Sequence, residues 1–251
     1  MRRVAVLVAA MGCGAGVSHD PQGQDHTVLV LAGPFEMGCH QATDPACTTA
    51  DELPYHQVTV SAFRIDETEV TQAAYALCVN DGVCTAPATN FDPNNRADFP
   101  VTNVSWFQAA SYCAWASMRL PTEAEWEKAA RGTDDRTYPW GSESPTCALT
   151  NFDGCGDAVQ PVGMHPAGAS PYGALDMAGN VVEWVADSYA ADYYAASPTT
   201  DPAGPASGTN RVKRGGDYTR RASDLRVSRR AAPPPGDAED EKGFRCARSG
   251  S

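Results

Sequence analysis

Nine cysteines constrain this chain more than any other feature of its 251 residues. Six of them fall into pairs that are close in the sequence, and we expect these pairs to form local disulfides: Cys39–Cys47, Cys78–Cys84 and Cys147–Cys155. Cys13, Cys113 and Cys246 lie apart from these pairs. Without Cys13 the number is even, which in an exported chain is typical of a disulfide framework. No CxxC motif occurs, so structural zinc is not expected.

The N-terminus has the features of an export signal. Arg2 and Arg3 form a basic start, and Val4–Met11 is a short apolar stretch. Ala10–Cys13 (AMGC) resembles a bacterial lipobox, whose cysteine is lipidated and becomes the first residue of the mature protein. We therefore predict a signal segment at residues 1–13, a flexible tether at 14–26, and a lipoprotein of the bacterial cell envelope. The alternative is a plain secretory signal, with Cys13 removed or left free.

The composition limits the partners that the chain can have. Its formal charge is -12, and an acidic surface repels phosphate backbones, so nucleic acid is not expected as a partner. Some of the carboxylates are candidates for calcium ligands. No apolar run approaches the ~20 residues of a membrane-spanning helix, so we expect membrane contact only through the lipid anchor. The 22 glycines and 19 prolines indicate a loop-rich domain.

Short strands and helices alternate with turns. Thr27–Met37 predicts a strand, a Gly-Pro turn and a second strand, and Val58–Ile65 alternates as a half-buried strand does. Helices are expected after the N-cap residue Thr71 and over Ser105–Met118 and Thr122–Ala130, the last opening on a capping box of Thr122 and Glu125. Tyr193–Asn210 is expected to be an exposed loop. Further short strands are expected at Asn180–Val185, Arg211–Gly215, Arg226–Arg229 and Phe244–Cys246.

Five segments together resemble the formylglycine-generating enzyme, or sulfatase-modifying factor, family. They are NVSWFQAASYCAWASMRLPTEAEWEKAARG (Asn103–Gly132), YPWG (Tyr138–Gly141), YGALDMAGNVVEWVAD (Tyr172–Asp187), GGDYTRRASDLRVSRR (Gly215–Arg230) and GFRCAR (Gly243–Arg248). The resemblance implies an α+β fold, a single C-type-lectin-like domain with little regular secondary structure over residues 27–251, expected to be a monomer. It also implies a disulfide between Cys113 and Cys246.

The resemblance places the reactive centre of the family on residues that lack its chemistry. Family enzymes carry two cysteines after the GG pair, which bind copper and oxidise a substrate cysteine. The matching positions here are Arg220 and Leu225. Neither side chain supplies the thiolate that copper(I) prefers, so copper is not expected. A relocated pair, Cys147 and Cys155, is the alternative, although their spacing favours a structural bridge.

Two calcium sites are implied by the resemblance. The first would use Asp176, the carbonyls of Gly179 and Val181, and Glu183. The second begins at Asn151 and Phe152 and would continue to Asp157 and the carbonyl of Val159. The alternative interpretation is that Asp176 and Glu183 only cap turns.

Arginines and aromatic residues also gather in the matched segments. The arginines either bind an anionic ligand in the cleft or form ion pairs within the protein with acidic residues such as Asp217 and Asp224. They are Arg211, Arg214, Arg220, Arg221, Arg226, Arg229 and Arg230. The tryptophans match core positions of the family. Tyr189, Tyr193 and Tyr194, in or before the expected loop, are candidates for ligand contact.

These features predict an exported, lipid-anchored, calcium-stabilised and non-catalytic binding module for a peptide, protein or glycan. One alternative is an oxidoreductase that still converts a sulfatase cysteine to formylglycine. Another is cysteine-independent oxidative maturation of a secondary metabolite, as in family members that mature pyoverdine-type pigments. The histidine cluster that ergothioneine-type relatives use for iron is absent from this sequence.

Overall fold

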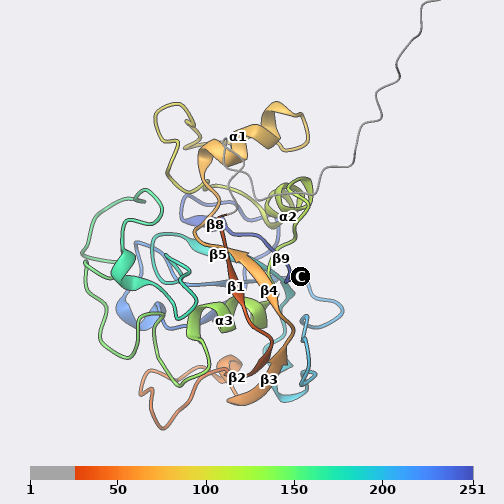
Figure 1. The fold of residues 1–251 in the computed structure, drawn as a ribbon, viewed down its shortest axis with the longest axis vertical. Coiled ribbons are helices and arrows are strands. Elements are labelled where there is room, and N and C mark those ends of the chain that lie inside the picture. Colours follow the sequence, from red (N-terminus) through yellow and green to blue (C-terminus); the bar gives the residue numbers. More distant parts are fainter. Residues whose placement is uncertain (1–25, 251) are drawn as a thin grey trace, which may run out of the picture.

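The computed structural model describes residues 26–250. The predicted signal segment, residues 1–13, and the predicted tether up to residue 25 lie outside the described residues. Nine short strands and three α-helices are joined by long connections, as expected for a C-type-lectin-like α+β domain (Figure 1). None of the helices in the described part of the chain is long and apolar enough to cross a membrane.

The strands form three small sheets. The first has the order β1-β4-β9, built from Thr27–Val30, Phe63–Asp66 and Ala247–Ser249, so both ends of the described chain meet in one sheet. The second pairs β2 (Gly33–Met37) with β3 (His56–Val60). The third has the order β7-β6-β5-β8, from Arg230–Ala231, Arg211–Arg214, Val182–Ser188 and Lys242–Phe244, with β5 and β8 parallel.

Side-chain caps fix the starts of the three helices. Thr71 accepts a hydrogen bond from the N–H of Ala74 at the start of α1 (Gln72–Asn80). Ser105 and Thr122 form capping boxes with Gln108 and Glu125 at the starts of α2 (Trp106–Trp115) and α3 (Glu123–Arg131). These starts agree with the sequence-based predictions because capping depends on residues within one turn.

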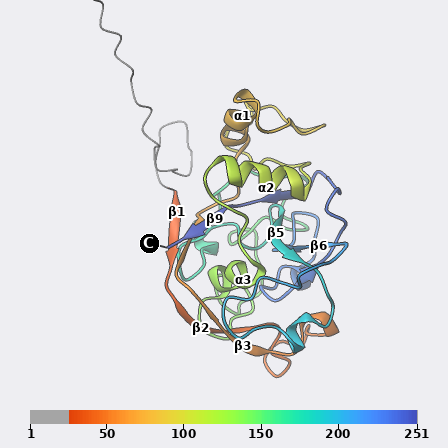
Figure 2. The same cartoon turned by 90° about the vertical axis from the view of Figure 1, so that its right-hand side faces the viewer.

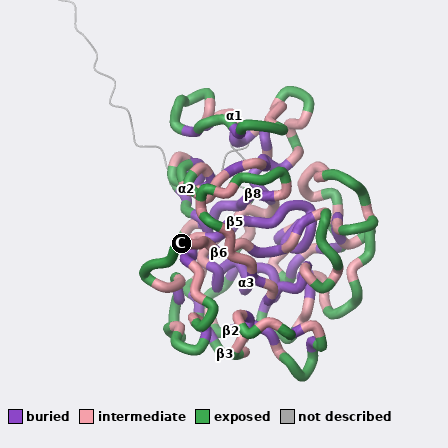
Figure 3. Tube along the Cα trace, turned by 180° about the vertical axis from the view of Figure 1, so that it is seen from behind, coloured by how far each residue is buried: buried purple, intermediate pink, exposed green. Residues whose placement is uncertain are grey.

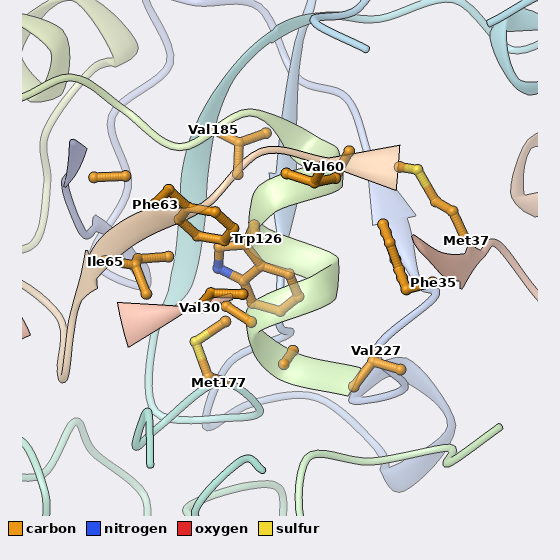
Figure 4. Close-up of a cluster of buried hydrophobic side chains, with 14 of the residues drawn as sticks. Val30, Phe35, Met37, Val60, Phe63, Ile65, Trp126, Met177, Val185 and Val227 are labelled. Atoms are coloured by element: carbon orange, nitrogen blue, oxygen red, sulfur yellow. The ribbon is translucent and has the colours of Figure 1, made fainter. Parts of the chain in front are cut away.

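Helix α3 lies in the middle of the domain, with α1 and α2 towards one end and β2–β3 towards the other (Figures 1 and 2). Its Trp126 is fully buried among Val30, Phe63, Ile65 and Met177 from three other parts of the chain (Figure 4). All nine residues of α3 are buried, including its charged ones. Figure 3 shows that burial is concentrated around α3, β5 and β6, whereas the connecting loops are exposed.

A second core cluster lies between α1, α2 and the β5–β8 pair. Tyr75 and Tyr112 stack with ring centroids 5.4 Å apart, and both rings pack against Phe244. The disulfide Cys113–Cys246 crosses this cluster and joins α2 to the segment before β9. The three expected local disulfides, Cys39–Cys47, Cys78–Cys84 and Cys147–Cys155, are also present.

Several predicted elements needed correction. Val58–Ile65 is not one strand, because the N–H and hydroxyl of Ser61 turn to the carboxylate of Asp201, both at 2.7 Å, and end β3 there. The Gly-Pro pair at residues 33 and 34 begins β2 and does not form the preceding turn.

The C-terminal predictions also shift. Arg226–Arg229 is a turn closed by the bond from Arg229 N to Arg226 O, and the strand begins only at Arg230. The strands expected at 180–185 and 244–246 lie instead at 182–188 and 242–244.

Candidate functional site

A pocket of about 150 Å³ opens where β6 ends, and Arg220, one of the two residues that the sequence analysis assigned to the reactive centre, lines it. Strands β6 and β7, Val182 at the start of β5 and the loop after Gly215 form its walls. The charged residues that line the pocket are Lys213, Arg214, Asp217, Arg220, Asp224, Arg229 and Arg230.

Gly216 brings the backbone close to the packed residues beneath the pocket. Its φ is +69°, in the left-handed region, and an added Cβ would lie 2.8 Å from the side chain of Leu225 and 2.9 Å from the carbonyl oxygen of Asp224. Glycine is required here for both its conformation and its size. The GG pair therefore shapes the pocket wall.

Arg220 and Leu225, which the sequence analysis matched to the two thiol positions of the resembled family, occupy different environments. Leu225 is fully buried and packs with Tyr138 and Ala178. Arg220 is exposed at the rim, and its Nε donates to Oδ2 of Asp217 at 3.1 Å. This hydrogen bond raises the pKa of Arg220, so its guanidinium stays charged.

The eight cysteines of residues 26–250 are all disulfide-bonded. Cys147 and Cys155, the alternative thiol pair, are bonded to each other, and neither lines the pocket at β6.

Three of the clustered arginines have a structural role. Arg214 Nη1 donates to Glu123 at 3.1 Å and Arg230 Nε to the same carboxylate at 2.7 Å, both within the core. Arg226 Nη1 bonds Glu52 at 2.7 Å. Buried cations need such partners, so the structural interpretation holds for these three residues.

Tyr194 is not available to a ligand, although it was predicted as a contact. Its side chain is only 3% exposed, and Arg230 lies over its ring at 4.3 Å from the centroid. The expected loop thus begins with a 3-10 turn, Tyr193–Ala195, in which only Tyr194 is buried. Tyr189 is half-buried, and its hydroxyl donates to Asp51 at 3.0 Å.

The first predicted calcium site lies in an acidic region around Asp176. Oδ2 of Asp176 accepts from the N–H of Gly163 at 2.6 Å. Glu183 is already engaged, because Arg245 donates to both of its oxygens and Trp126 donates to Oε2 at 2.9 Å. Glu69, which the sequence analysis did not single out, lies close by and is 1% exposed. Burial, and then the charge of Asp176, raise the pKa of Glu69 well above its usual range.

One carboxylate oxygen of Glu69 lacks a hydrogen-bond partner, and this observation supports a bound cation beside Asp176. Glu69 Oε1 accepts from Asn180 at 3.1 Å, but the buried Oε2 has no partner within the described residues. A bound cation would satisfy that oxygen together with Asp176. No three His, Cys, Asp or Glu side chains converge as a metal-binding group anywhere in residues 26–250. Asp176 and Glu69 therefore fit a cation that takes its other ligands from carbonyl oxygens, whereas Glu183 does not fit without giving up Arg245.

The second predicted calcium site is less complete. Asn151 is buried, but its amide nitrogen donates to the carbonyl of Ala158 at 3.0 Å and contacts Asn180, so it holds the loop together. Asp157 is exposed, and Phe152 and Val159 are half-buried. The structure brings Asn151 and Asn180 together and leaves the Asp157 carboxylate at the surface.

A larger pocket of about 570 Å³ lies between β4, α1 and α2, and Asp66 and Glu69 are among its lining residues. Asp66 Oδ2 accepts from the N–H of Cys246 at 2.8 Å. Burial nevertheless raises the pKa of Asp66 to about 7.

The mixed sheets and the few helices define a domain with the fold of formylglycine-generating enzymes. The chain belongs to the family described as the Sulfatase-modifying factor enzyme 1-like domain, which matches residues 15–250. It is 32% identical to the formylglycine-generating enzyme of Streptomyces coelicolor over 305 residues, covering 97% of this chain and 96% of that protein.

Other relatives carry different names. The chain is 35% identical to the hercynine oxygenase of Mycolicibacterium smegmatis over 241 residues, which covers 80% of this chain and 56% of that protein, so it spans little more than half of that relative. Its fold is similar to that of PvdO from Pseudomonas aeruginosa, with a TM-score of 0.77 and 28% identity, covering 89% of this chain and 94% of PvdO. Treponema denticola variable protein 1 has a TM-score of 0.73 at 26% identity, covering 89% of this chain and 95% of that one.

Proposed function

We propose that this chain is an exported, non-catalytic member of its family that binds a peptide, protein or glycan partner in the pocket at the end of β6. The observation that carries the proposal is the pair Arg220 and Leu225. One is a guanidinium paired with Asp217, and the other is a hydrocarbon packed against Tyr138.

Ligand chemistry explains why this pair matters. Copper(I) is a soft ion that prefers thiolate ligands. Leu225 has no donor atom, and a guanidinium is always protonated and has no lone pair to give. The positive charge of Arg220 would also repel a copper ion at short range.

Copper(I) titration against a colorimetric chelator tests this proposal. We expect the wild-type protein to withdraw no copper from the chelator. The double variant Arg220→Cys/Leu225→Cys should gain copper binding, whereas each single change should not, because one thiolate is an incomplete site. Stoichiometric copper binding by the wild-type protein would refute the proposal.

Export by a lipoprotein signal is the second part of the proposal. The disulfides of residues 26–250 support it, because such bonds persist in oxidising compartments outside the cytoplasm. Changing Cys13 to Ala should move the protein from the membrane fraction to the soluble fraction or block its processing. A wild-type protein that is fully soluble and begins after another cleavage point would exclude the lipid anchor.

Calcium is the third part. We propose that a calcium ion lies beside Asp176 and the buried carboxylate of Glu69, where the unpartnered oxygen of Glu69 supports a cation. Oxygen atoms of carboxylates and backbone carbonyls are the ligands that calcium prefers. Its role would be structural, since it would offset the charge of two buried carboxylates.

A further inference from the structure

Lys213 differs from the other cations that line the pocket at the end of β6. Arg220 pairs with Asp217, Arg229 with Glu52 and Asp224, and Arg230 with Glu123. Lys213 has no ion pair or side-chain hydrogen bond within residues 26–250, although it is half-buried. Burial, and then the positive charges of Lys242 and Arg220, lower its pKa, while Asp217 and Glu241 act in the opposite direction.

The backbone beside Lys213 offers unused donors. Among the described residues, no acceptor takes the N–H groups of Gly216 or Asp217, although Asp217 is buried. Gly216 has a positive φ of 69°, whereas the following Asp217 does not have a positive φ, so the handedness of the backbone alternates along these two residues. Buried N–H groups are nearly always paired, and successive N–H groups in such turns form concave sites that bind anions.

The two carboxylates in the pocket wall are already engaged. Oδ1 of Asp217 accepts from the N–H and the hydroxyl of Thr219, and Oδ2 accepts from Arg220. Asp224 lies 3.5 Å from Nε of Arg229. Neither carboxylate pairs with Lys213. Both would repel the second negative charge of a doubly charged phosphate, so a singly charged anion suits the pocket better.

We propose that this pocket binds a carboxylate group of a peptide partner, held by the Lys213 ammonium and the backbone N–H groups of Gly216 and Asp217. A space of about 150 Å³ admits one such group. Capture of a carboxylate by a backbone turn of this kind is a known mode of peptide recognition. The inference rests on the proposed function, because it assigns a ligand class to the same pocket. The carboxylate comes either from a peptide C-terminus or from an acidic side chain.

The chain has only three lysines, which makes a direct test possible. With the protein labelled at lysine 13Cε, NMR gives one signal each for Lys128, Lys213 and Lys242. The probes are N-acetyl-Ala-Ala-Ala as the free acid, the same peptide as its C-terminal amide, and N-acetyl-Ala-Asp-Ala amide. We expect at least one carboxylate-bearing probe to shift the Lys213 signal and raise its pKa, because an anion stabilises the protonated amine.

Controls identify the source of the signal. Lys128 donates to the carbonyls of Leu31 and Gly33 and does not line the pocket, so its signal should not move. Lys242 pairs with Asp237 and Glu239, and its signal should move less than that of Lys213. The Lys213→Gln variant removes the reporting signal and assigns it, and the wild-type titration needs no variant to fold.

The peptide arms separate the outcomes. A shift with the free acid alone assigns a C-terminal carboxylate, and a shift with the aspartyl peptide assigns an acidic side chain. A Lys213 signal that ignores both carboxylates, responds equally to the neutral amide, or responds only to inorganic phosphate would overturn the inference. Those results would leave the copper titration untouched, so failure here is distinct from failure of the proposed function.

Discussion

Arg245 donates two hydrogen bonds to Glu183, from Nη2 to Oε1 at 2.7 Å and from Nε to Oε2 at 2.8 Å. Both side chains are almost completely buried. This pair ties the segment after β8 to β5, and it occupies a carboxylate that the sequence had suggested as a calcium ligand.

Glu183→Ala should therefore destabilise the protein severely. Removing one partner of a buried ion pair leaves the other charge unpaired, which costs about 3–5 kcal/mol. Urea unfolding measures the change. Asp134→Ala is the control, because Asp134 pairs with Arg136 at the surface, where such a pair contributes about 0–1 kcal/mol. Equal losses in the two variants would mean that the Glu183–Arg245 pair does not hold the core.

Calcium should raise the melting temperature, because an ion that binds only the folded chain stabilises it by mass action. Asp176→Ala should abolish most of that increase. Glu69→Gln should also reduce it, and should raise the melting temperature in chelator, because the neutral amide avoids the cost of keeping a buried carboxyl whose pKa is raised above its ordinary value. Asp192→Ala is the control, because Asp192 is exposed and belongs to neither predicted calcium site. Melting that is unaffected by a chelator after exhaustive dialysis would eliminate the calcium site.

Stability should fall as the pH rises from about 4 to about 7, in part because of Asp66. Its pKa is about 7 in the folded protein against an ordinary value of 3.8, so the folded state holds the proton over that range and the unfolded state does not. One proton contributes a slope of up to about 1.4 kcal/mol per pH unit. Asp66→Asn should flatten the pH dependence measured by chemical unfolding. A variant that keeps the full slope would assign it to other buried acids, such as Asp187, and not to Asp66.

Disulfide Cys113–Cys246 should stabilise the fold more than Cys78–Cys84. The sequence separations are 133 and 6 residues, and loop-closure entropy gives about 5 and about 2.4 kcal/mol respectively. Double cysteine-to-alanine variants of each pair, compared by urea unfolding, measure the difference. Non-reducing peptide mapping checks the pairing itself. Free thiols at Cys113 and Cys246 in the folded protein would contradict it.

Local features of the fold were readable from the sequence, and long-range ones mostly were not. Thr71, Ser105 and Thr122 mark helix starts because a cap needs only the next three residues. The break at Ser61 depends on Asp201, which is distant in sequence, so the alternating pattern of Val58–Ile65 wrongly predicted one strand. The pairing of Cys113 with Cys246 came from the family resemblance.

The site divides in the same way. The motif around the GG pair located Arg220 and Leu225. Lys213 and Glu69 were not predicted as site residues, because their lack of partners depends on residues that are distant in the sequence. The sequence pattern indicated the position of Lys213 only weakly, because Lys213 lies between Val212 and Arg214, which are both buried in β6.

Aldehyde formation on a sulfatase-type cysteine peptide, with copper(I) and oxygen supplied, tests the central claim most directly. Mass spectrometry of the peptide measures formylglycine, and an active formylglycine-generating enzyme serves as the positive control. We predict no product above background from the wild-type protein, because Arg220 and Leu225 supply no thiolate. Turnover comparable to that of the control enzyme would contradict the claim, and Cys147 and Cys155 would then be the first residues to mutate.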